Sequence, residues 1–228
     1  MKIYDVIVVG AGHAGIEAAC AAARMGCQVA CITLSKNKIG HMPCNPAVGG
    51  IGKGHIVFEI AALGGVMPQL CTKTYLQANM LNKSKGPAVQ GLRLQIDKVA
   101  YAYEAQKYMS EQSNITLIEG MAMGIVVENG HIQGIQMNND VVFGKTVVIT
   151  TGTFLNGLLH IGFEKKIGGR ENEAAATELT LSLHKHGIVT QRLKTGTPAR
   201  LEKQSVNTAI MQEQASDELD SLFEFTPH

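Results

Sequence analysis

The chain has 228 residues, of which 45% are apolar and 17% are charged, and its formal net charge is +1. This length allows one large domain or two small ones, and the apolar fraction is sufficient for a sizeable core. The balanced charge excludes a global field that would draw the whole chain to nucleic acid, although a local basic patch is still compatible with it.

The chain opens with a βαβ pattern. Residues 4–9 (YDVIVV) are a β-branched run that predicts a buried strand. Residues 14–26 are rich in strong helix formers and close on Gly26, a typical residue after a helix. Residues 27–34 (CQVACITL) predict a second buried strand. Two parallel strands joined by a helix predict an open α/β sheet.

The apolar segments and the cysteines indicate the compartment. The first apolar run, Val6–Val9, is far too short for a signal segment or a membrane span. No later apolar run reaches the roughly 18 residues that a span requires. The five cysteines lack a disulfide-like spacing and fit a reducing compartment. We therefore expect a cytoplasmic protein.

The rest of the chain alternates helical and strand patterns. Residues 54–65 predict a helix that ends at Gly64, and one long helix is expected from about Gln90 to Gln112. Residues 115–144 predict a β-meander with turns at ENG and NND, followed by another buried strand in KTVVITTG. A last helix is expected near residues 176–187, and a polar, acidic tail follows.

A glycine fingerprint lies between the first predicted strand and helix. Gly10, Gly12 and Gly15 form G-x-G-x-x-G. The first glycine makes a tight turn, the second lets the backbone approach a pyrophosphate, and the third lets the helix pack close to the strand. The motif alone is weak, but its position inside a βαβ unit is the context that supports it. The alternative is a glycine-rich turn without a ligand.

The second predicted strand departs from the usual NAD pattern. Its end, Thr33–Ser35, carries hydroxyls but no carboxylate for a ribose. A meander, a buried strand and a turn at Thr151 and Gly152 come later, in an order typical of FAD domains of the glutathione-reductase type. The sequence therefore favours FAD over NAD in a Rossmann-like α/β domain with a helical insertion.

The segment HMPCNPAVGGIGKGH, residues 41–55, allows three interpretations. A P-loop would need Gly at position 47 and Ser or Thr at position 54, where the chain has Ala47 and Gly54. A zinc site is disfavoured because C-x-x-C is absent and because Cys44 flanked by His41 and His55 has an unsuitable ligand spacing. No metal site is predicted. The remaining interpretation is a reactive site beside a cofactor.

Cys44 is the centre of that third interpretation. Pro43 and Pro46 would hold it in an extended backbone, and the glycines that follow would let the loop lie against a flat ring. Lys53 and nearby N–H groups would favour its thiolate. The alternative is an inert cysteine, the usual case. A local surface for an anionic ligand is a further possibility, although such clusters are more often solvated faces; its members are Lys83, Lys85, Arg93, Arg170, Arg192, Lys194 and Arg200.

These blocks together resemble a known family. DVIVVGAGHAGIEAACAAARMG, CNPAVGGIGKGH, NKSKGPAVQGLRLQ, TTGTFLNGLLHIG, GGR and RLKTGTPAR occur in the order and spacing of the N-terminal part of the GidA/MnmG proteins. The resemblance spans residues 4 to about 200. It implies an FAD-dependent enzyme that adds a carboxymethylaminomethyl or aminomethyl group to carbon 5 of the wobble uridine of tRNA. It also implies a homodimer, the GTPase partner MnmE, and NADH and methylene-tetrahydrofolate as co-substrates.

The resemblance also assigns residues. Cys44 matches a cysteine considered catalytic, acting on the uridine ring or on proton transfer. Thr177 falls where the family usually carries Ser near FAD, in a block, ENEAAATELTLS, that departs from the family's Pro-containing version. The cofactor-binding positions that we expect from the motifs and the resemblance are Gly10, Ala11, Gly12, His13, Ala14, Gly15, Ala122, Thr151, Gly152 and Thr177.

The chain is shorter than the family. We expect residues 1–200 to be the N-terminal FAD-binding domain and residues 201–228 to begin the following NADH-binding insertion, here truncated. The resemblance implies that the return segment of the FAD domain and the C-terminal helical domain are missing, so the fold is expected to be incomplete. Two other functions remain open: a general FAD- or NAD-dependent oxidoreductase on small substrates, and a non-catalytic dinucleotide-binding fragment.

Overall fold

The computed structural model describes residues 2–170, 173–196, 198–199 and 201–224. They form two compact units, each built from two separate stretches of chain. The first unit comprises Met1–Gly40 and Tyr103–Arg192, and the second comprises His41–Ala102 and Leu193–His228. These compact units do not test the predicted boundary at residue 200, between an FAD-binding domain and a following insertion, and that boundary stays a prediction.

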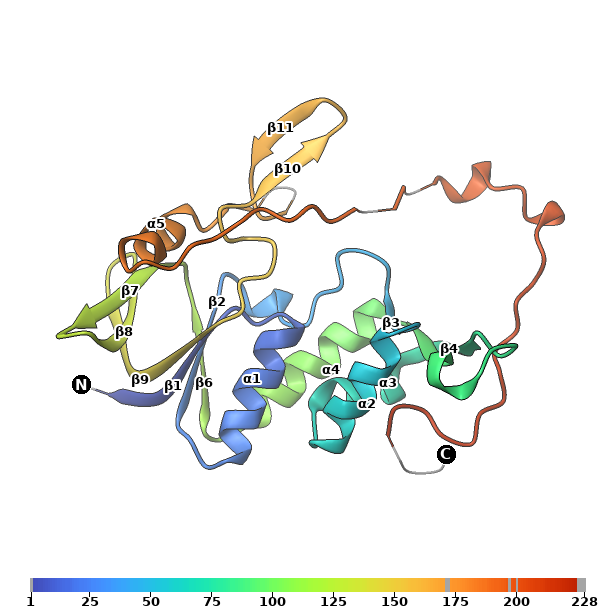
Figure 1. The fold of residues 1–228 in the computed structure, drawn as a ribbon, viewed down its shortest axis with the longest axis horizontal. Helices are drawn as coiled ribbons and strands as arrows, with labels where there is room; N and C mark the ends of the chain where they lie inside the picture. Colours follow the sequence, from blue (N-terminus) through green and yellow to red (C-terminus); the bar gives the residue numbers. More distant parts are fainter. Residues whose placement is uncertain (1, 171–172, 197, 200, 225–228) are drawn as a thin grey trace. The chain divides into compact units, whose positions relative to one another are not determined.

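The first unit is built on one six-stranded sheet with the strand order β6-β2-β1-β9-β8-β7 (Figure 1). Four neighbouring strands run parallel, and the last two add to them in antiparallel fashion. The parallel strands are β6 (Ile115–Glu119), β2 (Val29–Thr33), β1 (Ile3–Val9) and β9 (Val141–Ile149), and the antiparallel ones are β8 (His131–Met137) and β7 (Ala122–Glu128). This architecture confirms the predicted α/β class.

The predicted βαβ start is confirmed. Helix α1 (His13–Arg24) joins β1 to β2 and lies along one face of the sheet (Figure 1). It buries Ile16, Cys20 and Ala23, which recur at helical spacing, while Ile7 and Val8 of β1 are fully buried. On this side the thiol of Cys20 lies 3.4 Å from the sulfur of Met109.

The meander differs from the prediction in one respect. The expected third meander strand and the separate buried strand are a single strand, β9. Its first residues pair with β8, as in Phe143 with Gly134, and the strand pairs with β1 from Phe143 to its end, as in Val147 with Ile7. The polar turn at residues 138–140 therefore separates β8 from β9, and Gly144 continues the strand rather than ending it.

The second face of the sheet is closed by α5 (Thr177–Lys185), the helix expected near residues 176–187. Leu179 and Leu183 of this helix join residues of β1, β2, β7 and β8 in one hydrophobic cluster. The Ser182 hydroxyl accepts a hydrogen bond from Ile125 N at 3.0 Å and fixes α5 on β7. A small exposed hairpin, β10 (Leu158–Ile161) and β11 (Glu164–Ile167), precedes the helix.

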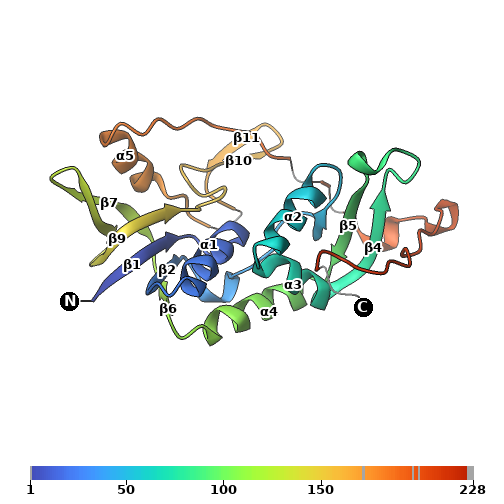
Figure 2. The same ribbon diagram turned by 60° about the horizontal axis from the view of Figure 1, so that its bottom comes forward.

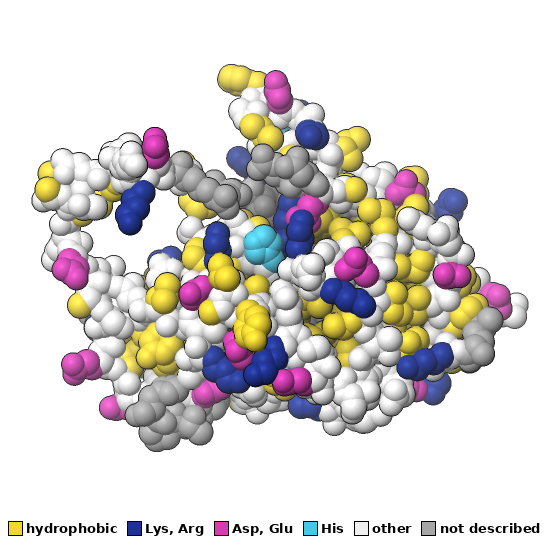
Figure 3. Space-filling model, turned by 180° about the vertical axis from the view of Figure 1, so that it is seen from behind, with side chains coloured by type: hydrophobic (Ala, Val, Ile, Leu, Met, Phe, Trp, Pro, Cys, Tyr) yellow, Lys and Arg dark blue, Asp and Glu magenta, His cyan; other side chains and the backbone are white. Residues whose placement is uncertain are grey.

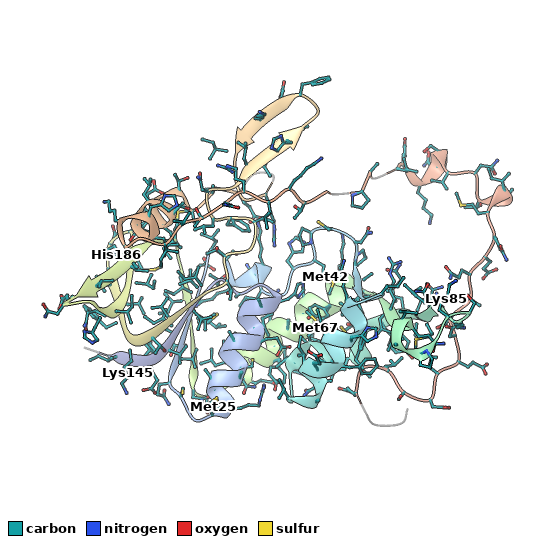
Figure 4. The ribbon with its side chains drawn as sticks, viewed as in Figure 1. Met25, Met42, Met67, Lys85, Lys145 and His186 are labelled. Atoms are coloured by element: carbon teal, nitrogen blue, oxygen red, sulfur yellow. The ribbon has the colours of Figure 1, made fainter. Side chains whose placement is uncertain are left out.

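The carboxylate of Asp5 links the amino-terminal parts of neighbouring parallel strands. Lys145 donates to Asp5 at 2.6 Å, and Gln28 N donates to the other oxygen of the same carboxylate at 2.8 Å. Met25, which follows α1, lies toward this end as well (Figure 4). The opposite edge of the sheet, where the strands end, carries the glycine fingerprint.

The second unit contains a three-stranded antiparallel sheet and two helices (Figure 2). The strand order is β3-β5-β4, with the bounds β3 (Ala47–Gly49), β5 (Gly91–Ile96) and β4 (Tyr75–Leu81). Helix α2 (Lys53–Ala62), predicted from the sequence, packs on β3 and β5 and is followed by α3 (Val66–Thr74). Short 3-10 turns occupy Pro87–Val89, Lys203–Ser205 and Thr208–Ile210 in this unit and Lys36–Lys38 in the first unit.

The long helix expected from Gln90 to Gln112 is wrong in its first third. Residues 91–96 form β5, and helix α4 covers only Lys98–Glu111. Leu92, Leu94 and Ile96 alternate with polar residues, and this period of two buries one face of a strand. Asp97 then starts the helix, since its carboxylate accepts hydrogen bonds from the N–H groups of residues 99 and 100.

The acidic tail is part of the second unit. Asp217 N donates to Ala78 O at 2.8 Å, so the tail runs beside β4. Its carboxylate accepts from Met80 N at 2.7 Å and forms an ion pair with Lys83. Phe223 is fully buried and packs edge-to-face on Phe58, with ring centroids 5.2 Å apart. The tail therefore completes the core of this unit.

No single helix among the described residues is long and apolar enough to cross a membrane. Helices α2 and α3 meet the length and composition criteria only when taken together, and they are bent by 113° at their junction.

Candidate functional site

The candidate site of the first unit lies where the parallel strands end. Three backbone hydrogen bonds of 2.8 Å join these ends, from Gly10 N to Ile32 O, from Gly120 N to Thr33 O, and from Thr150 N to Val9 O. The carboxyl edge of an open parallel sheet is the usual place for a ligand in α/β proteins. The predicted positions 10–15, 122 and 151–152 all follow strands at this edge.

The three fingerprint glycines differ in what surrounds them. A Cβ on Gly10, whose φ is +103°, would lie 2.4 Å from Thr150 O, and one on Gly15 would lie 1.7 Å from Gly10 O. A Cβ on Gly12 would meet nothing within 4 Å. The first and third glycines are therefore required by the fold itself. The open space at Gly12 is what a closely approaching ligand needs.

Thr150 is a site residue that the sequence analysis missed. Its hydroxyl lies 2.9 Å from Val9 O and 3.0 Å from Gly10 O, and it donates to these carbonyls at the start of the glycine turn. The predicted Thr151 and Gly152 come directly after it, and Gly152 takes the left-handed conformation with φ +59°. The two consecutive threonines of VITTG could have indicated this role, but only the second, Thr151, was predicted to be a site residue.

His13 is the first residue of α1. Burial lowers the pKa of His13, and the nearby charge of Arg170 lowers it further, so its imidazole is neutral at pH 7. The two alanines of the fingerprint differ in burial. Ala11 is buried and accepts a hydrogen bond from Gly40 N at 3.2 Å, whereas Ala14 is exposed. The loop before Gly40 thus returns to the glycine turn.

The two remaining predicted positions share one cluster. Ala122 is the first residue of β7 and is buried with Ala176, which directly precedes α5. Thr177 is the first residue of that helix. The structure therefore brings Ala122 and Thr177 to elements that meet through the same core. Their contact with a cofactor stays a prediction.

A carboxylate does stand at the end of β2, although not from β2 itself. Glu119, the last residue of β6, accepts a hydrogen bond from Lys36 N at 2.7 Å. Thr33 at the end of β2 donates its hydroxyl to Ser35 O at 3.3 Å. No local pattern indicates this role of Glu119, because 83 residues separate it from Lys36.

The Cys44 loop belongs to the second unit. Cys44 is exposed and lies in an irregular segment before β3. The turn after β3 is left-handed at Gly49, Gly50 and Gly52, with φ of +86°, +101° and +71°. A Cβ on Gly49 would lie 2.2 Å from Leu92 O and 2.5 Å from the Phe223 ring. The glycines are thus needed for the turn and its packing.

The other cysteines are in different surroundings. Cys20, Cys31 and Cys71 are buried and Cys27 is half-buried. Burial raises the pKa of the Cys20 and Cys31 thiols to about 12, so both stay protonated at neutral pH. Among the residues that the structure describes, no group of three or more His, Cys, Asp or Glu side chains could hold a metal ion.

The predicted basic cluster is distributed over both units. Lys83 is paired with Asp217, while Lys85 lies in the turn after β4 (Figure 4). Arg170 lies in the first unit, and Arg200 lies outside the described residues. Figure 3 shows Lys and Arg side chains interspersed with Asp and Glu on the face displayed. The described residues of that face therefore mix both signs of charge.

Comparison with known proteins places this geometry in a family. The family model described as "Glucose inhibited division protein A" matches residues 5–228. A relative from Geobacter sulfurreducens, named tRNA uridine 5-carboxymethylaminomethyl modification enzyme MnmG, is 45% identical over 99% of this chain and 36% of its own length. The enzyme of the same name from Synechocystis is 47% identical over 98% of the chain and 36% of its own length.

Solved structures agree. A crystal structure of Aquifex aeolicus GidA is 42% identical and has a TM-score of 0.94 over 98% of this chain and 37% of its own. The GidA-related protein from Thermus thermophilus shares the fold at 22% identity, with a TM-score of 0.57 over 82% of this chain and 69% of its own. The chain spans about a third of the length of the curated relatives that it matches. It belongs to the glucose-inhibited division protein A family.

Proposed function

We propose that this chain is the FAD-binding part of a tRNA uridine modification enzyme. The observation that carries the proposal is the open position at Gly12, beside a turn that Gly10 and Gly15 fix, at the carboxyl edge of a parallel sheet. The MnmG names of the relatives support the substrate class. A buried Nε atom of Arg170 without a hydrogen-bond partner among the described residues also fits an anionic cofactor in the same unit.

The residues proposed to hold FAD are those at the strand ends. The turn at Gly10–Gly15 would receive the pyrophosphate against the N–H groups of α1. Ala122 would meet the adenine side, and Thr151, Gly152 and Thr177 would complete the contacts. When bound, FAD supplies hydride chemistry. The chain's own part is to hold and orient it.

Cys44 is proposed as the nucleophile. Its thiolate would form a bond to carbon 6 of the uridine ring, and the electrons of the 5,6 double bond would move onto the carbonyl oxygen at carbon 4. The resulting enolate makes carbon 5 nucleophilic toward a one-carbon donor. Loss of the carbon 5 proton and release of the thiolate would then restore the ring. The exposure of Cys44 is compatible with this role.

The finer assignments concern activities and partners of the full-length family enzymes. They comprise NADH and methylene-tetrahydrofolate as co-substrates, MnmE as partner, a homodimer, addition of a carboxymethylaminomethyl or aminomethyl group, and a cytoplasmic location. They rest on the resemblance to the family.

Two measurements test the proposal. Purified chain is mixed with FAD, desalted, and its visible spectrum recorded; retained flavin is expected, and a colourless protein would contradict the FAD assignment. The chain is then incubated with an anticodon stem-loop RNA that carries 5-fluorouridine at the wobble position. An adduct at Cys44, found by peptide mass spectrometry and absent in Cys44→Ser, is expected. An adduct on another residue, or none, would refute the nucleophile role.

A further inference from the structure

Arg170 belongs to the first unit, and its backbone pairs with that of Glu173. Gly169 N donates to Glu173 O and Glu173 N donates to Arg170 O, both at 3.0 Å. Gly168 N donates to Gly157 O at 3.1 Å and ties this segment to the chain that follows Gly152. The backbone of Arg170 is therefore fixed from two sides.

The side chain of Arg170 is held as well. Its guanidinium carbon lies 5.1 Å from the centroid of the Phe154 ring, a cation–π distance. The same ring lies against Gly169, where a Cβ would come within 2.0 Å of it. Thr153 donates to Gly169 O at 3.0 Å. Residues 153 and 154 directly follow the Thr151–Gly152 turn, so the arginine is positioned by the segment that leaves the candidate site.

No ion pair of Arg170 is present among the described residues near it, which exclude residues 171 and 172. Glu173, three residues further along, pairs with Lys38. The Nε atom of Arg170 is buried and has no hydrogen-bond partner among the residues that the structure describes. Leaving such a buried donor unsatisfied is unfavourable, because it has lost its hydrogen bonds to water without replacing them. An anion that accepts its hydrogen bond would remove this cost.

The charge of Arg170 also reaches the glycine turn. It contributes to the lowered pKa of His13, the first residue of α1, so the two side chains are within electrostatic range. Helix α1 is 12 residues long, and its N-cap residue, Gly12, provides no side-chain cap. Gly12 has open space beside it. Hydrogen bonds support the proximity of Arg170 to the glycine turn, because Thr150 donates to Gly10 O and Thr153, three residues later, donates to Gly169 O, which directly precedes Arg170.

We propose that Arg170 binds the pyrophosphate oxygens of the dinucleotide received at Gly10–Gly15. The inference rests on the proposed FAD function and adds a residue to it. The planar fork of an arginine suits the paired oxygens of a phosphoryl group. Arg170 would thereby neutralise part of the negative charge that the uncharged residues 10–15 cannot.

The experiment compares probes that share parts of FAD. Binding of FAD, ADP and riboflavin to the full chain is measured by titration calorimetry for the native protein and for Arg170→Met. FAD and ADP carry the pyrophosphate, whereas riboflavin has the flavin ring and its ribityl chain but no phosphate. We expect Arg170→Met to weaken FAD and ADP about 10- to 100-fold, as for a hydrogen bond to a charged group, and to leave riboflavin unchanged. Arg170→Lys keeps the charge and folds more safely, and it should lose less.

Two controls complete the design. Arg24, exposed in the last turn of α1, is an arginine at the other end of the same helix, and Arg24→Met should change none of the three affinities. In the unliganded chain, Arg170→Met should raise the pKa of His13, followed by NMR, because a repelling cation is removed.

The outcomes separate the two proposals. An equal loss for riboflavin and FAD, or unchanged FAD affinity in both Arg170 variants, would overturn the role of Arg170. ADP binding that depends on Arg170, in a chain that rejects FAD, would uphold Arg170 and overturn the FAD assignment. A native chain that binds neither FAD nor ADP would overturn both.

Discussion

A Cβ on Gly15 would lie 1.7 Å from the carbonyl oxygen of Gly10, so the first turn of α1 and the end of β1 touch without a side chain between them. Gly12, between them, has nothing within 4 Å of its Cβ position. Gly15→Ala should therefore displace α1. We expect the unfolding free energy to fall by about 3 kcal/mol, in the range for an overpacked core, and the melting temperature to fall with it.

Gly12→Ala is the matched change at the open position. We expect it to melt like the native chain, or slightly above it, while losing retained FAD, because the methyl group would occupy the space of the pyrophosphate. Calorimetric melting and the absorbance of the desalted protein check both variants. Normal flavin retention in Gly12→Ala would show that no ligand approaches there.

His13 makes stability depend on pH. The pKa of His13 is lowered in the folded state by burial and then by Arg170, so the unfolded chain binds a proton first as the pH falls. Its contribution to stability is complete above the ordinary histidine pKa of about 6.5 and is lost progressively below it. Between pH 7.5 and pH 5.5, the melting temperature of His13→Gln should fall less than that of the native chain. Each kcal/mol of unfolding free energy corresponds to about 2–4 °C in melting temperature. Parallel curves for both proteins would contradict this.

Phe223 closes the core of the second unit. Phe223→Ala should cost about 3–5 kcal/mol, the range for a buried phenylalanine, and should expose the tail to proteolysis. Phe163, fully exposed in the turn between β10 and β11, gives the same truncation without burial, and Phe163→Ala should stay within about 0.5 kcal/mol. Urea unfolding measures both. Equal effects of the two changes would mean that the tail does not pack as described.

The cysteines should differ in reactivity. Iodoacetamide applied to the native chain is expected to modify exposed Cys44 first and half-buried Cys27 more slowly. Cys20 and Cys31 should resist, because burial raises the pKa of each thiol to about 12. Peptide mass spectrometry follows each site over time, with denatured chain as the fully reactive reference. Early labelling of Cys31 would show that the sheet opens at its centre.

The sequence predicted the elements whose signals are local. The βαβ start, α2, α5 and the Asn129–Gly130 turn all follow from hydrophobic period, helix formers or turn residues within a few positions. The strand β5 was predicted as helix, because its leucines and the helix formers of α4 were taken as one segment; the alternation of Leu92, Leu94 and Ile96 was the correct signal.

What escaped the sequence depends on contacts between distant residues. Thr150 reaches Gly10 across 140 positions, and Asp217 reaches Met80 across 137. No sequence pattern near Thr150 or Asp217 indicates its distant partner. The pairing of β9 with both β8 and β1 is a further case, since a strand's neighbours are set by the whole sheet rather than by its own residues.

Each compact unit is made of two stretches that alternate along the chain. During synthesis, the first 40 residues cannot complete their sheet before β9 is made. The Cys44 segment cannot complete its packing before Phe223 is made. Neither core can therefore close while the ribosome is still adding residues 41–140. The edge of β1 that pairs with β9 and the edge of β4 that meets Asp217 therefore stay unpaired until these later residues are made, so strand edges that are covered in the folded protein are exposed in the nascent chain.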